Sequence, residues 1–239
     1  GDLRHPAGRL ASQALRGAER EAACKALSHS DCRNVFSMGT APLIHTFPDG
    51  RQLLLAGQKW GYVYAMDPDD GGRVVWRSKV ATGGDMGGVL YGLASDGKQI
   101  YVPVSDVDSP TPGSAGSLLA LDPADGRTLW RRDGPVPRCG WEAPYCTAAQ
   151  IAALSAVPGA VFGGFNDGWL RAFSTRDGKQ IYGFDTAVDF KTVNGVPARG
   201  GQVAGYPVVV GRHALFVTSG ASSVERPGNA LLVFTVDGN

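Results

Sequence analysis

The sequence predicts an all-β protein, a β-propeller of about four four-stranded antiparallel blades that would form half of an eight-bladed ring, preceded by a short N-terminal helix. The first observation is glycine content, 34 of 239 residues, about twice the average usage of roughly 7%. So much glycine disfavours helical bundles and indicates many turns between short strands. With 43% hydrophobic residues, a chain of this length can build a hydrophobic core that needs no disulfide bond or metal ion for its stability.

The second observation is an internal repeat, which determines the predicted architecture. Each copy consists of a glycine, eight residues and then an Asp-Gly pair. The copies end at Asp70-Gly71, Asp125-Gly126, Asp177-Gly178 and Asp237-Gly238, so they follow at intervals of 55, 52 and 60 residues. An aromatic residue follows the first three pairs, at Trp76, Trp130 and Tyr182. We expect these aromatic side chains to pack against the next blade.

Short apolar runs and turn signals define the strands within each repeat. One apolar run precedes each glycine, and a second lies further upstream, for example at 89–91 and 207–210. Between these runs stand turn sequences such as Pro48-Asp49-Gly50 and Ser95-Asp96-Gly97. Each unit therefore predicts a four-stranded antiparallel meander, and radial repetition of such meanders produces a propeller.

The N-terminal region differs from the repeats. Residues 11–28 are rich in Ala, Leu, Glu and Arg, lack proline and contain a single glycine, a pattern typical of a helix. We therefore divide the chain into a helical lead-in, residues 1–35, and propeller blades, residues 36–239. The chain begins Gly-Asp-Leu-Arg without an apolar leader, so we expect a processed chain or a piece of a longer one.

Charge and hydropathy exclude several partners. The formal net charge is +1 with no long run of one sign, whereas a nucleic-acid-binding protein usually carries a basic face. The longest apolar stretch, residues 151–165, is interrupted by Pro158 and three glycines, so no transmembrane segment is expected. The four histidines form no zinc-binding pattern, and we predict no metal site from these residues.

Four cysteines fall into two local pairs, Cys24 with Cys32 and Cys139 with Cys146. These spacings suit two short disulfide-closed loops and do not match CxxC zinc or redox sites. Disulfides would place the protein in an oxidising compartment, such as the bacterial periplasm, and four unlinked thiols in a reducing cell are the alternative.

Several motifs resemble those of pyrroloquinoline-quinone (PQQ) propeller proteins. The stretch Ala120-Leu-Asp-Pro-Ala-Asp-Gly-Arg-Thr-Leu-Trp130 resembles their tryptophan-docking repeat. More narrowly, residues 36–239 are similar to the C-terminal half of polyvinyl-alcohol dehydrogenases. This similarity is carried by the segments 55–67, 101–106, 193–201 and 227–234.

The resemblance implies an eight-bladed propeller with PQQ and a calcium ion at its axis, which oxidises alcohols to carbonyls. It implies that Lys59 lies beside the quinone oxygens, although the residues alone also fit a solvated lysine. Arg199, Gly200 and Gly201 would lie in a central loop, where Arg199 could clamp a cofactor carboxylate or pair with an acidic neighbour. Asn229 is a candidate hydrogen-bonding residue for the cofactor or a turn asparagine.

The resemblance also shows departures that motivate a second hypothesis. Where the family carries an acidic Asp-Phe-Asp-Phe-Gly-like segment, this chain reads Val35-Phe36-Ser37-Met38-Gly39. Four blades are present, and an open half-propeller would expose two sheet faces. The chain is therefore expected to be a PQQ-dependent dehydrogenase-type propeller, truncated or degenerate, or else a non-catalytic scaffold of an envelope complex that binds no cofactor. In either case a protein partner would complete or cover the ring.

One acidic loop offers a further candidate. Asp106 and Asp108 lie in the polar loop 105–114, where calcium binding and a solvated loop are the two interpretations. Of these, the sequence favours the solvated loop.

Overall fold

The computed structural model describes residues 37–84, 86–107, 116–139, 147–220 and 226–236. These residues form strands, turns and loops, and they contain no helix. The predicted helix at 11–28 and the lead-in 1–35 lie outside the described residues. The all-β class predicted from the glycine content and the repeat is confirmed.

Four antiparallel sheets follow one another along the chain, each strand pairing with the next in sequence. The first sheet contains β2 (Leu43–Thr46), β3 (Gln52–Gly57), β4 (Tyr62–Asp67) and β5 (Arg73–Lys79). The second contains β7 (Ala94–Ser95), β8 (Ile100–Val104), β9 (Ser117–Leu121) and β10 (Thr128–Asp133). The third contains β11 (Ser155–Val157), β12 (Ala160–Gly164), β13 (Trp169–Ser174) and β14 (Gln180–Asp185). The fourth has three described strands, β17 (Val208–Val210), β18 (Ala214–Ser219) and β19 (Ala230–Thr235).

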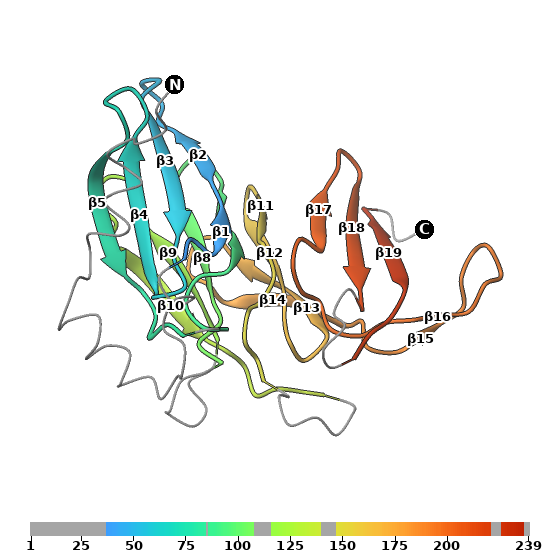
Figure 1. The fold of residues 1–239 in the computed structure, drawn as a ribbon. Coiled ribbons are helices and arrows are strands. Elements are labelled where there is room, and N and C mark those ends of the chain that lie inside the picture. Colours follow the sequence, from blue (N-terminus) through green and yellow to red (C-terminus); the bar gives the residue numbers. More distant parts are fainter. Residues whose placement is uncertain (1–36, 85, 108–115, 140–146, 221–225, 237–239) are drawn as a thin grey trace, which may run out of the picture.

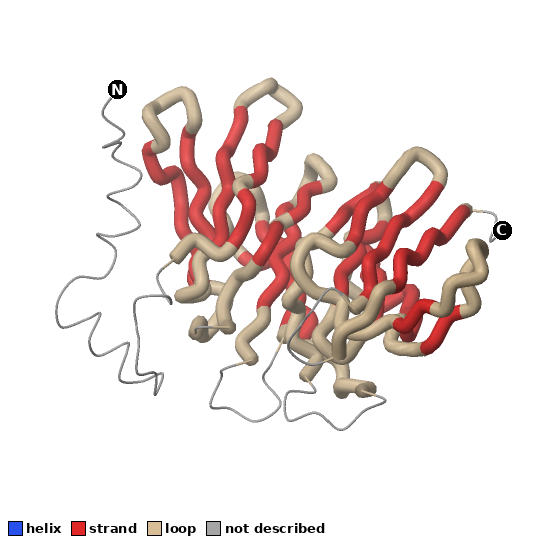
Figure 2. Tube along the Cα trace, turned by 45° about the vertical axis from the view of Figure 1, so that its right-hand side comes forward, coloured by secondary structure: helices blue, strands red, loops and turns tan. Residues whose placement is uncertain are grey.

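The sheets stand side by side like an open fan, with the first and fourth at opposite ends (Figures 1 and 2). Two short pairs accompany them. β1 (Thr40–Ala41) pairs in parallel with β6 (Tyr91–Gly92) at the inner side of the first sheets, and β15 (Asp189–Phe190) pairs with β16 (Ala198–Arg199) in a hairpin before the fourth sheet. The arrangement is that of consecutive propeller blades.

The strands and turns lie close to their predicted positions, with one correction. The apolar run at 89–91 was expected to form the first strand of the second sheet, but this strand, β7, begins at Ala94. Tyr91 instead belongs to the parallel pair, with a φ of 65°. The predicted turn glycines Gly50, Gly97 and Gly159 have positive φ, as hairpin turns require.

Apolar side chains between neighbouring sheets form the core. Leu55 and Ala65 on the first sheet face Ile100 and Leu121 on the second, and all four are fully buried. A second cluster joins the second and third sheets, and a third cluster around Val217 joins the third and fourth. The core therefore consists of separate apolar layers, and each layer lies between two neighbouring sheets.

The predicted packing of the aromatic residues on the next blade is confirmed. The indole Nε1 of Trp76 donates to the carbonyl of Pro123 at 2.9 Å, and that of Trp130 donates to the carbonyl of Thr175 at 3.1 Å. A Cβ atom on Gly126 would lie 2.4 Å from the Trp76 ring. Tyr182 contacts Phe234 of the fourth sheet edge to face, with ring centroids 6.5 Å apart.

Candidate functional site

Buried polar residues gather at the end of the fan where the second strand of each sheet finishes. In the first and third sheets the turn after this strand begins at Gln58 and Asn166, which are 1% and 4% exposed. The second sheet places Ser105 and Asp106 there, and the fourth places Ser219. In Figure 1, β3 and β18 both run toward the lower edge, so their following turns lie at the same end of the molecule.

Asp106 is a buried carboxylate of this end that accepts hydrogen bonds from three backbone amides. It is 3% exposed, and its oxygens accept hydrogen bonds from the amides of Thr82 at 2.8 Å, Gly83 at 2.9 Å and Gly88 at 3.2 Å. The expectation of a solvated loop is therefore wrong for Asp106, because the connection between the first two sheets folds over its side chain. Asp108 lies outside the described residues.

A lysine lies against aromatic rings beside this loop. Lys79 Nζ is 4.1 Å from the centre of the Trp60 ring and 4.9 Å from that of Tyr62. It donates to the carbonyls of Trp60 and Thr82, the latter at 3.2 Å. Burial lowers the pKa of Lys79 to about 8, and the charge of Asp106 opposes this shift.

Lys59, the predicted cation, lies on the turn between β3 and β4. Its side chain is half-buried. Its backbone is fixed from both sides, because the amide donates to the carbonyl of Ser37 at 3.1 Å and the carbonyl accepts from Gly84 at 3.2 Å. This turn packs tightly, since a Cβ atom on Gly88 would lie 2.0 Å from the Lys59 carbonyl oxygen.

The other four predicted site residues come together at the fourth sheet. The amide of Arg199 donates to Asn229 Oδ1 at 2.9 Å, and the amide of Asn229 donates to the carbonyl of Arg199 at 2.8 Å. Arg199 Nε donates to Asp189 Oδ1 at 3.0 Å in an exposed pair. The acidic neighbour anticipated as an alternative for Arg199 is thus present, and it is Asp189. Asn229 holds the backbone of Arg199 through the two hydrogen bonds between these residues.

The predicted glycines belong to the same cluster. A Cβ atom on Gly200 would lie 1.6 Å from the carbonyl oxygen of Thr186, and one on Gly201 would lie 1.9 Å from that of Arg226. These distances show that glycine is needed here for backbone packing. Lys59 lies on the first sheet, whereas this cluster lies at the fourth, at the opposite end of the fan (Figure 1).

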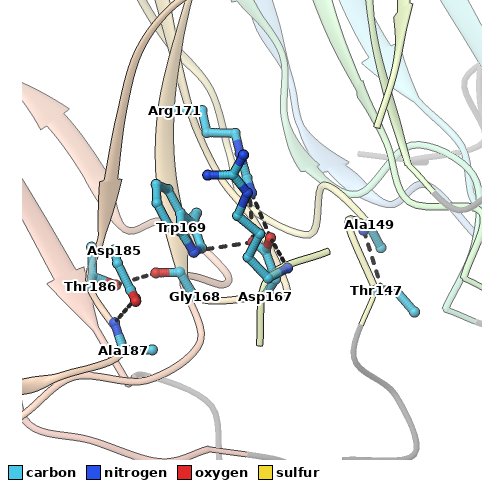
Figure 3. A network of polar contacts seen from close by, with 10 residues as sticks. Thr147, Ala149, Asp167, Gly168, Trp169, Arg171, Asp185, Thr186 and Ala187 are labelled. Carbon is cyan, nitrogen blue, oxygen red and sulfur yellow. Dashed lines mark hydrogen bonds and ion pairs between the residues drawn. The ribbon is translucent and has the colours of Figure 1, made fainter. Parts of the chain in front are cut away.

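The third sheet contributes a buried ion pair to this polar end, between Asp167 in the turn after β12 and Arg171 on β13. Arg171 Nη1 and Nη2 donate to the two carboxylate oxygens of Asp167 at 2.8 and 2.6 Å, and the side chains are 2% and 0% exposed (Figure 3). The same carboxylate accepts the amides of Trp169 and Arg138 at 3.2 and 3.1 Å. Arg171 also lies over the Phe165 ring, 4.5 Å from its centre.

Amide side chains extend this network from sheet to sheet. Gln202 Nε2 donates to Asn166 Oδ1, and Asn166 Nδ2 donates to Thr147 Oγ1 at 3.2 Å. Gln150 is fully buried, and its carboxamide oxygen and nitrogen have no hydrogen-bond partner in the described part of the chain. Buried polar atoms without partners are rare, and Gln150 is the described side chain in which both the amide oxygen and the nitrogen lack one.

The Asp167–Arg171 pair was not predicted, although the repeat contains a signal for it. Register places Arg171 at the position of Tyr64 in the first sheet and Leu119 in the second, both buried. A charge at a core position of a repeat implies a buried partner. Comparing the repeats position by position would therefore have indicated this pair.

The structure adds little on metals and disulfides. Among the described residues, no group of three or more His, Cys, Asp or Glu side chains is placed to hold a metal ion. Cys139 is disulfide-bonded, and the other three cysteines lie outside the described residues, so the two predicted pairings stay predictions. In the same described part, no helix is long and apolar enough to cross a membrane.

Comparison with known proteins identifies the family. A family model described as outer membrane protein assembly factor BamB matches residues 36–231. The chain therefore belongs to this PQQ-like β-propeller family. The class of protein defined by the repeated sheets and tryptophan docking is thereby confirmed.

Individual relatives refine this assignment. The chain is 40% identical over 213 residues to a polyvinylalcohol dehydrogenase of a Pseudomonas species, covering 85% of this chain and 33% of the relative. It is 35% identical over 232 residues to a polyvinylalcohol dehydrogenase of Sphingopyxis sp. strain 113P3, covering 90% of this chain and 35% of the relative. The chain thus spans about a third of the length of these relatives.

A solved structure supports the fold. BamB from Moraxella catarrhalis resembles the chain with a TM-score of 0.54 and 18% identity, over 84% of this chain and 51% of BamB. The match covers about half of that protein and supports the propeller fold alone.

The residues present at the polar end fit PQQ in charge. PQQ is a planar quinone with three carboxylates, so a site for it requires cations and N–H donors. Exposed or half-buried cations stand at this end on Lys59, Lys79, Arg138 and Arg199. The buried carboxylates of Asp106 and Asp167 are already satisfied by protein donors. The exposed carboxylates of Asp133 and Asp189 stand at this end as well, and Asp189 is paired with Arg199. The cations that PQQ requires are therefore present, with Arg199 already engaged by a carboxylate.

Proposed function

We propose that this chain forms part of a periplasmic PQQ-dependent alcohol dehydrogenase of the polyvinyl-alcohol dehydrogenase type. The similarity to two polyvinylalcohol dehydrogenases over 85–90% of the chain carries this proposal. The cations at the polar end support it, because an anionic quinone requires positively charged side chains in its site. PQQ would supply the two-electron oxidising capacity that side chains lack.

Lys59 would stand beside the quinone oxygens and stabilise negative charge there. Arg199 would bind a cofactor carboxylate by exchanging it for Asp189, which is exposed and therefore easily replaced. Asn229, bonded to the Arg199 amide, would hold that backbone in position, while Gly200 and Gly201 allow the tight packing beneath it. Calcium would accompany the cofactor, with ligands that the described residues do not identify.

The test is reconstitution of the purified chain with PQQ and Ca²⁺. Quinone binding is followed by tryptophan fluorescence, and activity by dye-linked oxidation of a secondary alcohol. We expect Lys59→Ala to weaken PQQ binding, and Lys98→Ala, an exposed lysine on a turn at the other end, to leave it unchanged. A wild-type chain that does not bind PQQ would refute the proposal for this chain.

A second candidate is a non-catalytic scaffold of an envelope complex. It is favoured by the absence of a carboxylate at 35–39 and by the engagement of Asp106 and Asp167 with protein donors, which removes both as proton acceptors. A monomeric chain whose alcohol oxidation is abolished by Lys59→Ala would exclude the scaffold. Cell fractionation tests the proposed extracytoplasmic location, which the family's outer-membrane assembly factor supports.

A further inference from the structure

A cavity of about 330 Å³ lies between the second and third sheets, beside their last strands β10 and β14. We call it the inter-sheet cavity. Its volume is at the lower end of the range of small-molecule pockets, roughly 300–1,000 Å³. The residues that line it come from β10 and the segment after it and from the end of β13 to the start of β14, and they are Arg132, Asp133, Pro135, Phe173, Asp177, Gly178, Lys179 and Gln180.

Part of this lining is apolar. Phe173 belongs to the core cluster between the two sheets and is 5% exposed. Pro135 adds a second apolar surface. An apolar group placed against these two side chains would be removed from water, so a ligand with an apolar portion gains binding energy here.

The two carboxylates of the lining have arginine partners that do not line the cavity. Asp133 accepts a hydrogen bond from Arg131 Nε at 3.0 Å. Asp177 Oδ2 lies 3.6 Å from Arg176 Nη2. A positive charge from outside the cavity therefore stands beside each of its carboxylates.

The two cations of the lining, Arg132 and Lys179, form no ion pair with a described carboxylate. Arg132 is held in place, because its Nε and Nη2 donate to the backbone carbonyl of Asp177 at 3.0 and 2.6 Å. Within the described part of the chain, neither Arg132 Nη1 nor the Lys179 ammonium donates a hydrogen bond. Hydrogen-bond donors of both cations are thus available to a ligand.

The corresponding turn of the second sheet shows how a protein carboxylate matches such a cation. There Arg127 takes the place of Lys179, since its carbonyl accepts from Asp122 as that of Lys179 accepts from Ser174. Arg127 pairs with Asp122 at 2.7 Å and with Asp125 at 3.6 Å. Ser174 stands in the position of Asp122, so Lys179 lacks this partner.

We infer that the inter-sheet cavity binds a small organic carboxylate. Its oxygens would accept hydrogen bonds from Arg132 Nη1 and the Lys179 ammonium, and its apolar part would cover Phe173 and Pro135. A neutral ligand would leave both cations unmatched, whereas an inorganic anion would leave the apolar lining in water. This site goes beyond the proposed function and includes none of the four cations named for PQQ.

Titration of the 239-residue chain with 2-naphthoate, followed by calorimetry, tests this site. Two further probes separate the parts of the ligand, because 2-naphthamide has the rings without the charge and inorganic phosphate has the charge without the rings. We expect 2-naphthoate to bind more tightly than either and its affinity to fall with added salt. Amide chemical-shift changes should be centred on residues 132–135 and 177–180.

The variant Lys179→Gln removes one cation whose side chain makes no hydrogen bond or ion pair with a described residue, so the fold should be kept. We expect roughly fivefold weaker binding of 2-naphthoate, as for an exposed charge pair, and unchanged binding of 2-naphthamide. Arg127→Gln, at the corresponding paired position, is the matched control and should leave the affinity unchanged. Urea unfolding checks that both variants are folded.

A wild-type chain that does not bind 2-naphthoate would overturn the inference. Equal affinities for 2-naphthoate and 2-naphthamide, or equal losses in Lys179→Gln and Arg127→Gln, would do the same. Phosphate that binds at these residues as tightly as 2-naphthoate would assign the cavity to inorganic anions instead. Shifts centred on Lys59 or Arg199 would place the anion at the polar end and also contradict the inference.

Discussion

Substitution of Asp167 by Asn removes one charge from the most deeply buried ion pair of the described structure. The carboxylate accepts two bonds from Arg171 and two from backbone amides, and neither side chain of the pair exceeds 2% exposure. Solvent therefore does not screen the guanidinium that the substitution leaves behind. The asparagine Nδ2 would also face the Arg171 N–H donors.

The cost follows from this burial. Removing one partner of a buried pair destabilises a protein by about 3–5 kcal/mol, which lowers the Tm of a chain of this size by roughly 6–20 °C. The exposed pair of Arg131 and Asp133 gives the control, because its side chains are 41% and 82% exposed. There Asp133→Asn should cost about 0–1 kcal/mol.

Urea unfolding followed by tryptophan fluorescence, with calorimetry for the Tm, measures both variants. A loss below about 1 kcal/mol for Asp167→Asn, equal to the control, would refute the reasoning that the pair is desolvated. The double variant Asp167→Leu with Arg171→Met separates charge from packing, because it removes both charges. We expect it to recover most of the lost stability.

Three further predictions concern contacts between sheets. Trp76→Phe should cost about 1–3 kcal/mol in denaturant unfolding, since it leaves the buried carbonyl of Pro123 without its indole donor. Gly126→Ala should destabilise more than Gly50→Ala in the same assay. Both glycines have positive φ, but only at Gly126 would the Cβ atom collide with an indole ring. Burial lowers the pKa of His45 against the charge of Asp96. The unfolded chain then binds a proton that the folded chain does not, so stability should fall as pH drops below about 6.5, and His45→Gln should flatten that slope.

The repeat predicted the sheets because its signals are local. Turn glycines such as Gly50 and Gly126 adopt positive φ whatever surrounds them, and apolar runs between turns favour strands. The docking of Trp76 and Trp130 was predictable for a related reason, since a radial array gives every outer strand the same neighbour.

The site was less predictable than the sheets. Arg199, Gly200, Gly201 and Asn229 were predicted from the family resemblance, and the structure brings them into one cluster with Lys59 elsewhere. Asp106 was expected in solvent, yet the chain folds over it, because its amide partners come from a loop 18–24 residues earlier. That the cluster around Arg199 and the side chain of Lys59 bind a cofactor stays a prediction.

Sequence alone thus determined the number of repeated units, their strands and turns, and the face on which each aromatic residue lies. These features depend on backbone preferences and on spacing within a few residues. Only the tertiary structure decided which polar groups become buried together, such as Asp167 with Arg171 and Gln202 with Asn166. It also left Pro68 and Gly71 exposed, whereas Pro123 and Gly126, at the corresponding turn of the second sheet, are buried. Burial is a property of the neighbouring sheet, and the residue's own segment of sequence does not contain that neighbour.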